Sequence, residues 1–96
     1  MKIARVIGSA VSTVKDPKLT GLKLLIVQQA SPSNEVFGDA FIAADTVGAG
    51  EGELVMLVEG SSARQTGKTL ESAVDAVIIG ILDSIRVGDE VVFQKS

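Results

Sequence analysis

The side chains that could do acid–base chemistry in this sequence are carboxylates, because the 96 residues include 12 Asp and Glu but no His and no Cys. Ser-His-Asp and Cys-His catalytic constellations therefore cannot be built, and the usual nitrogen and sulfur ligands of transition metals are missing. Two of the carboxylates, Glu51 and Glu53, lie in a glycine-rich segment. Three others lie at the ends of predicted strands: Asp45, Asp75 and Asp83. Carboxylates at such positions more often form turns or carry solvated charge than catalyse reactions. We predict a protein that is not an enzyme, with no catalytic residue, no metal site and no cofactor.

The run Gly67-Lys68-Thr69 matches the end of a phosphate-binding loop. In a complete loop of this kind, a first glycine stands where this chain has Ser62, so that backbone N–H groups can wrap the phosphates. The nearest glycine, Gly60, is two residues too early. A small anion- or nucleotide-binding module that uses the glycine-rich loops is therefore the alternative prediction, and not the leading one.

A second glycine-rich segment runs from residue 48 to residue 52, with the sequence Gly-Ala-Gly-Glu-Gly. Its spacing differs from that of a dinucleotide-binding loop, and no helix is predicted to follow it. A tight turn that needs positive φ angles is the favoured interpretation. The second interpretation, which stays open, is that the glycines permit backbones to approach closely at a symmetry axis.

The composition limits the classes of protein to which this chain can belong. The chain has enough residues for one domain, and its core must be aliphatic because 46% of the residues are apolar but only three are Phe, with no Trp or Tyr. Oligomerisation is the remaining source of added stability, since disulfides and metal sites are excluded. A formal charge of −3 disfavours nucleic acid and anionic membranes as partners. No signal peptide or membrane helix is indicated, so we expect a cytoplasmic protein.

The pattern predicts a mainly β fold. Runs of β-branched and aliphatic residues predict strands over 3–14, 22–29, 41–45, 54–60, 74–83 and 91–94, the last preceded by a turn at Gly88-Asp89. Gly8 indicates a bulge of the kind that bends a barrel strand, and the polar segment 61–73 is long enough for a short helix. The sequence therefore predicts a small, partly open, five-stranded OB-like β-barrel with one short helix.

Two of these strands are apolar on both faces, over 22–27 and 77–82. In a small barrel one face fills the interior, so the apolar outer face must meet another surface. This pattern indicates a subunit interface. Arg64, which follows small residues, could form a bidentate pair across that interface or could be a solvated loop charge.

Four stretches together resemble the vertex proteins of bacterial microcompartment shells, the family of the ethanolamine-utilisation N protein and the carboxysome L protein. In the order and spacing of that family they are MKIARVIGSAVSTVKDPKLTGLKLLIVQ at 1–28, ADTVGAGEGELV at 44–55, GSSARQT at 60–66 and VDAVIIGILD at 74–83. The combination of DTVGAGEGE with GSSAR is specific, and the stretches cover well over half of the chain.

The resemblance implies a single vertex domain over 1–96, with the core barrel over about 1–83 and a C-terminal tail strand over about 85–94. It implies a cyclic homopentamer that caps the five-fold vertices of a polyhedral microcompartment shell in the cytoplasm, with hexameric shell proteins as partners. Residue by residue, it places Val47, Gly48, Ala49 and Gly50 at the pore on the five-fold axis, and Ser61, Ser62, Ala63 and Arg64 at the subunit interface. Ethanolamine, propanediol, glycyl-radical and carbon-fixing compartments all remain compatible with the sequence.

Overall fold

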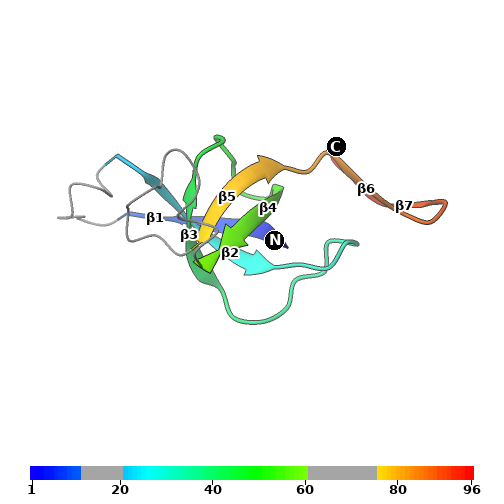
Figure 1. Ribbon diagram of the computed structural model, residues 1–96, viewed down its shortest axis with the longest axis horizontal. Helices are drawn as coiled ribbons and strands as arrows, with labels where there is room; N and C mark the ends of the chain where they lie inside the picture. The colour runs from blue at the N-terminus through cyan, green and yellow to red at the C-terminus, as the bar shows by residue number, and fades with distance from the viewer. Residues whose placement is uncertain (12–20, 61–75) are drawn as a thin grey trace.

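The computed structural model describes residues 1–11, 21–60 and 76–96, and these residues form seven strands (Figure 1). The strands are β1 (Lys2–Ala10), β2 (Lys23–Gln29), β3 (Phe41–Asp45), β4 (Leu54–Glu59), β5 (Ala76–Ile81), β6 (Ser84–Val87) and β7 (Glu90–Gln94). The predictions for β2 to β5 are confirmed to within two residues at either end, whereas β1 ends earlier than predicted. The helix predicted within 61–73 lies outside the described residues. Within the described ranges, no helix is long and apolar enough to cross a membrane.

Strands β1 to β5 form a closed barrel in the order β1-β2-β3-β5-β4, with β4 pairing back to β1. Neighbouring strands are antiparallel except at the seam between β3 and β5, where the parallel pairs are Ala44 with Val77 and Asp45 with Ile78. The Thr46 hydroxyl extends this seam by donating a hydrogen bond of 2.8 Å to the carbonyl oxygen of Ile78. The prediction of five OB-like barrel strands is confirmed, but the expected partial opening is wrong, because this short seam closes the sheet.

Side chains alternate between the barrel interior and its outer face, as a strand requires. Val6 of β1 is paired with Val27 of β2, and Leu57 of β4 with Ile78 of β5, and all four are buried. The predicted aliphatic core is thus confirmed. The buried members of this cluster are Ala4, Val6, Leu25, Val27, Ala43, Ala49, Val55, Leu57, Ala76 and Ile78.

A bulge lies in β1, at the position that Gly8 indicated in the sequence. The pairing of β1 with β2 shifts register between Val6 and Gly8, which leaves Ile7 as the extra residue. Bulges of this kind increase the local twist and bend a strand. The bent β1 pairs with β2 from Ala4 to Ala10 and with β4 from Lys2 to Arg5.

The outer face carries a second apolar cluster. Leu24, Ala44, Val77 and Val58 follow one another in register across β2, β3, β5 and β4, and Ala44 and Val77 are fully buried. The strands that are apolar on both faces therefore bury part of their outer side chains within the subunit. Ile42 on β3 nevertheless remains 54% exposed. The predicted subunit interface on this face stays a prediction.

Strands β6 and β7 form a two-stranded hairpin that is separate from the barrel sheet. The predicted turn is confirmed, with Gly88 at a φ of 61°. Figure 1 shows the hairpin projecting away from the barrel, while the C-terminus returns to its root. The strand pattern predicted β7 alone, because Ser84–Val87 contains just two apolar residues and gives little β signal. The family resemblance implied one tail strand over about 85–94, where the structure has two strands joined by a turn.

Candidate functional site: the glycine-rich loop and the root of the hairpin

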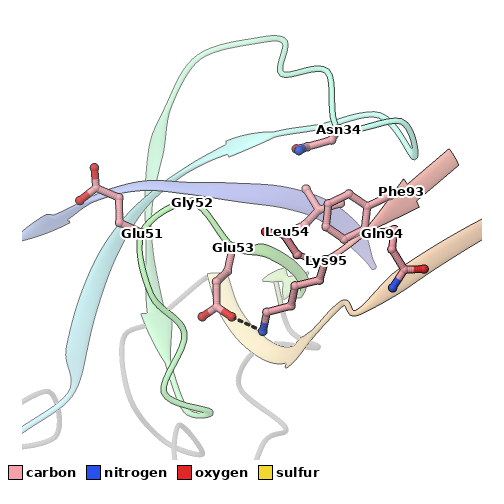
Figure 2. A pocket seen from close by; sticks show the side chains of 9 residues that line it. Asn34, Glu51, Gly52, Glu53, Leu54, Phe93, Gln94 and Lys95 are labelled. Carbon is pink, nitrogen blue, oxygen red and sulfur yellow. Dashed lines mark hydrogen bonds and ion pairs between the residues drawn. The ribbon is translucent and has the colours of Figure 1, made fainter.

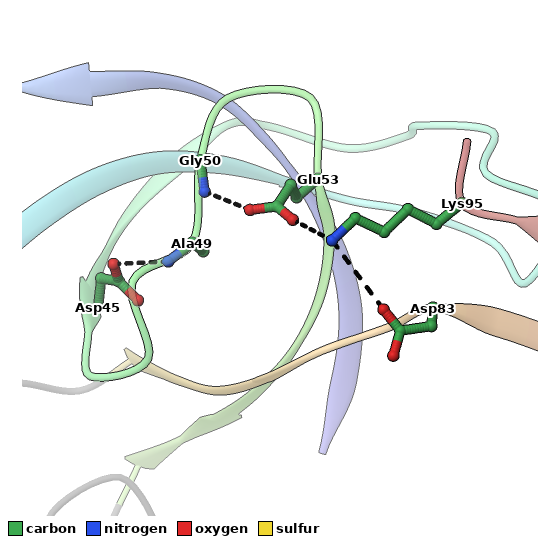
Figure 3. Close-up of polar contacts among 6 residues, drawn as sticks. All are labelled: Asp45, Ala49, Gly50, Glu53, Asp83 and Lys95. Atoms are coloured by element: carbon green, nitrogen blue, oxygen red, sulfur yellow. Dashed lines mark hydrogen bonds and ion pairs between the residues drawn. The ribbon is translucent and has the colours of Figure 1, made fainter.

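The loop 46–53 connects β3 to β4, and a carboxylate at the end of β3 organises it (Figure 3). Asp45 Oδ1 accepts hydrogen bonds from the backbone N–H groups of Val47 at 3.0 Å and Gly48 at 3.1 Å. Its Oδ2 accepts a hydrogen bond of 2.9 Å from the N–H of Ala49. Asp side chains stabilise turns in this way by bonding backbone donors a few residues onward. The interpretation of Asp45 as a turn former is therefore confirmed.

The four residues expected at a five-fold axis differ in where their side chains lie. Val47 is 39% exposed, and Gly48 is exposed with a φ of 79°, a conformation that favours glycine. Ala49 is fully buried in the barrel core, and Gly50 is half-buried. Ala49 thus anchors the loop to the barrel, while Val47 and Gly48 form its free surface.

Glu53 connects the end of this loop to the C-terminal tail (Figure 3). Its Oε1 accepts a hydrogen bond of 2.6 Å from the N–H of Gly50, and its Oε2 accepts one of 2.6 Å from Nζ of Lys95. Asp83 Oδ1 lies 4.0 Å from the same ammonium group. Lys95, followed by the Gly50 N–H, holds the pKa of the Glu53 carboxyl below its usual 4.5, against a smaller opposing effect of burial. The hydrogen bond to Glu53 in turn raises the pKa of Lys95.

The remaining backbone of the loop is tied to neighbouring strands. The N–H of Gly52 donates to the carbonyl oxygen of Val6 at 2.8 Å, and the N–H of Val6 donates to the carbonyl oxygen of Glu53 at 2.9 Å. Lys23 Nζ donates to the carbonyl oxygen of Ala49 at 3.2 Å. A phosphate-binding loop turns its N–H groups toward the ligand. Here the N–H groups of residues 47–50 and 52 donate to groups of the same chain, so this loop gives no support to the anion-binding alternative.

A pocket lies between the loop and the root of the hairpin, and Figure 2 shows how its side chains point. The carboxylates of Glu51 and Glu53 point in different directions, and only Glu53 meets Lys95. The structure therefore does not assemble them into an acid–base pair. Across the described ranges, no group of three or more His, Cys, Asp or Glu side chains is placed to hold a metal ion.

Two contacts in this region were missed by reasoning from the sequence. Lys95 follows Glu53 by 42 residues, and no local pattern links them. Arg5 donates from Nε to Oδ1 of Asn34 at 3.0 Å and also donates to the Asn34 carbonyl oxygen. Asn34 has a φ of 66°, a value that Asn tolerates better than most residues. An asparagine within a polar loop was the one feature of the sequence that could have indicated the contact of Arg5 with Asn34.

The second set of predicted site residues, Ser61, Ser62, Ala63 and Arg64, lies outside the described residues. The incomplete phosphate-loop motif at 67–69 also lies there. Their predicted roles are thus neither supported nor opposed by the geometry.

Comparison with known proteins gives consistent matches over the whole chain. The family model of the ethanolamine utilisation protein EutN/carboxysome family matches residues 1–83. The bacterial microcompartment shell vertex protein EutN of Escherichia coli (strain K12) is 45% identical over 95 residues, which cover 99% of this chain and 100% of that protein.

Solved structures match both the barrel and the hairpin. The structure of CcmL from Nostoc sp. PCC 7120, a carboxysome shell vertex protein, superposes with a TM-score of 0.92 and 42% identity, covering 99% of this chain and 100% of that one. GrpN, a pentameric microcompartment shell protein from Rhodospirillum rubrum, superposes with a TM-score of 0.82 and 41% identity, covering 92% of this chain and all of that one.

Proposed function

This chain belongs to the EutN/carboxysome family, and from that premise we propose that it is a structural protein of bacterial microcompartment shells. It forms pentamers that occupy the five-fold vertices of the shell. The observation that carries this function is the match of nearly the entire chain, at 45% identity, to a protein named as a shell vertex protein. The pentameric state rests on the similarity to GrpN, which superposes on this chain with a TM-score of 0.82.

A ring of identical subunits needs two different surfaces on each subunit, because the contacts of a cyclic assembly are heterologous and close only at the correct rotation. A closed barrel of five strands supplies a rigid body for such contacts. Exposed apolar side chains on the barrel, such as Ile42 at 54% and Val47 at 39%, are available for them. The function therefore depends on the shape of the interfaces and not on a reaction centre.

The barrel and the C-terminal hairpin are assigned different roles. We infer that residues 1–83 act as the vertex domain proper and that the tail over 85–94 is an attached element. The end of the match to the family model at residue 83, just before β6, supports this division.

We also infer that the loop residues Val47, Gly48, Ala49 and Gly50 lie near the five-fold axis. The exposure of Val47 and Gly48 supports this placement, and the burial of Ala49 means that its side chain holds the loop in position without lining a pore. The inference that Ser61, Ser62, Ala63 and Arg64 lie at the subunit interface rests on the sequence alone.

The finer proposal concerns the partners beyond the ring. We infer that the pentamer contacts hexameric shell proteins, because flat layers of six-fold tiles cannot close and five-fold units provide the missing curvature. The catalytic alternative has no support in the described residues, where Glu53 is engaged by Lys95 and Asp45 by the backbone.

Shell assembly tests this function. Hexameric shell proteins from the same host would be co-expressed with and without this chain, and the products would be imaged by electron microscopy. We expect closed polyhedra with the chain, and tubes, sheets or shells open at the vertices without it. Equally closed shells in both preparations, with none of this chain in them, would contradict the proposal.

A further inference from the structure

The β2–β3 loop (residues 30–40) runs outside the barrel between the two strands that it connects (Figure 1), and hydrogen bonds hold its turn in one conformation. The N–H of Ser31 donates to the carbonyl oxygen of Glu35 at 2.8 Å, and the N–H of Asn34 donates to the carbonyl oxygen of Ser31 at 2.9 Å. From β1, Arg5 donates to both Oδ1 and the carbonyl oxygen of Asn34. The turn is therefore preorganised, which lowers the entropy that binding a partner would cost.

The second half of the loop is tied to the end of β2. The N–H of Phe37 donates to the carbonyl oxygen of Gln29 at 2.9 Å. Nε2 of Gln28 donates to the carbonyl oxygen of Gly38 at 2.8 Å. These two bonds fix the backbone at Phe37 and at the residue after it. The position of Phe37 is thus set by its backbone and not by burial of its ring.

Two apolar side chains on this fixed backbone are exposed. Val36, whose backbone pairs with that of Ala30, is 36% exposed, and Phe37 is 50% exposed. Phe37 is also one of only three aromatic residues in the chain. Aromatic side chains are enriched in the contact surfaces of proteins, because a rigid ring buries a large apolar area. An exposed Phe on a preorganised loop therefore indicates a surface that binds a partner.

The carboxylates around Phe37 indicate the charge of that partner. Glu35 and Asp39 stand two residues before and two residues after Phe37, and neither forms an ion pair with another described residue. Alternation along the paired backbone places Glu35 on the same side as Phe37. The sequence has no Lys or Arg from residue 24 to residue 63. Arg5, the described basic side chain that hydrogen-bonds to the loop, is engaged by the turn.

We propose that the β2–β3 loop docks another protein through a segment in which Lys or Arg side chains flank apolar ones. The apolar part of that segment covers Phe37, and its cations lie against Glu35, Asp39 and the face of the Phe37 ring, which attracts positive charge. The same carboxylates would repel a nucleic acid or an anionic membrane. This interaction goes beyond the proposed shell function and does not depend on the ring.

The first test uses a fluorescently labelled peptide with Leu-Leu-Leu at its centre and Lys-Lys at each end. We expect saturable binding to the wild-type protein, measured by fluorescence anisotropy, that weakens at least about fivefold in Phe37→Ser because the apolar contact is lost. The control is Val11→Ser, which replaces an apolar residue that is 98% exposed and lies outside the loop. No saturable binding to wild type, or equal binding to the two variants, would overturn the proposal.

The second test separates local charge from the net charge of the chain. Glu35→Gln/Asp39→Asn should weaken binding of the Lys peptide about threefold or more at low salt, because the cations lose their partners. The matched control is Glu51→Gln/Asp89→Asn, which removes two exposed carboxylates elsewhere and changes the net charge equally. The same peptide with Glu in place of Lys should not bind. Equal weakening by both double variants, or binding of the Glu peptide, would show that the loop does not select a basic partner.

The third test asks whether a second copy of this chain covers Phe37 instead. Native mass spectrometry of Phe37→Ser and of wild type over the same dilution series should give the same oligomeric state at each concentration. An oligomer lost only in Phe37→Ser would assign the loop to a contact between copies and overturn the proposal. A wild-type chain that forms no ring but binds the Lys peptide through Phe37 would refute the proposed shell function alone.

Discussion

At the scale of single residues, two carboxylates do structural work in the same loop. Asp45 holds the beginning of the loop through three backbone N–H groups, and Glu53 holds its end through Gly50 and Lys95. Asp45 and Glu53 are both of residue types that could have served in acid–base chemistry. Their hydrogen bonds instead keep a loop with three glycines in one conformation.

The contribution of Asp45 can be measured by substitution. We expect Asp45→Ala to lower the free energy of unfolding by about 1–3 kcal/mol, because three backbone N–H groups, including that of the buried Ala49, lose their acceptor. Asp45→Asn keeps one side-chain oxygen and should lose less. Urea denaturation followed by circular dichroism measures both. Equal stability of wild type and Asp45→Ala would show that the hydrogen bonds to this carboxylate contribute nothing.

The stability due to Glu53 should depend on pH. Its pKa is lower in the folded protein than its usual 4.5, chiefly because of Lys95. The carboxylate therefore stabilises the fold above pH 4.5, and this contribution is lost as the pH falls through the lowered pKa. We expect the Tm of wild type to fall more steeply between about pH 5 and pH 3 than the Tm of Glu53→Gln. Glu51→Gln, which removes a neighbouring exposed carboxylate, should keep the wild-type slope, and parallel curves for all three proteins would contradict this account.

The sequence could predict Asp45 as a turn former because the relevant signal is local: an Asp at the end of a strand, followed by glycines. It could not predict the pair of Glu53 with Lys95 or the contact of Arg5 with Asn34. These pairs span 42 and 29 residues, and only the three-dimensional path of the chain brings them together. The burial of Ala49 was missed for the same reason, since nothing in a glycine-rich run marks one alanine as part of the core.

At the scale of elements, the barrel strands were predictable because continuous aliphatic runs bounded by Gly, Pro and polar residues determine them locally. The closure of the barrel was not predictable, since it depends on two parallel residue pairs between β3 and β5. The strand pattern did not predict β6 either, because its four residues include only two apolar ones. In the β6–β7 hairpin, sequence patterns therefore indicated the turn and β7 but not β6.

The glycine-rich loop offers an element-scale prediction that tests its placement near the axis. Gly48 and Gly52 both have positive φ angles, of 79° and 89°, and a β-carbon added at either would meet no heavy atom of the described residues within 4 Å. Gly48→Ala and Gly52→Ala should each lower the stability of the fold by about 1–2 kcal/mol through backbone strain.

The two variants should differ in assembly. If Gly48 lies near the axis, five added methyl groups crowd one another there, and Gly48→Ala should dissociate at a higher protein concentration than Gly52→Ala. Analytical ultracentrifugation of the two variants side by side gives the comparison. A ring weakened equally by both substitutions would show that Gly48 has no special place at the axis.

At the scale of the whole molecule, a closed barrel carries two further elements: a loop held by carboxylates, and the β6–β7 hairpin, which projects from it. The ion pair of Glu53 with Lys95 joins the loop to the residue that follows the hairpin. A protein whose function is to set an angle between subunits needs elements that are joined in this way.

The central claim is that this chain works as a closed ring of five, and native mass spectrometry of the purified wild-type protein over a range of concentrations tests it most directly. The account predicts a dominant species at five times the chain mass of 9.9 kDa. A monomer, a dimer or a six-fold ring as the dominant species at every concentration would contradict it.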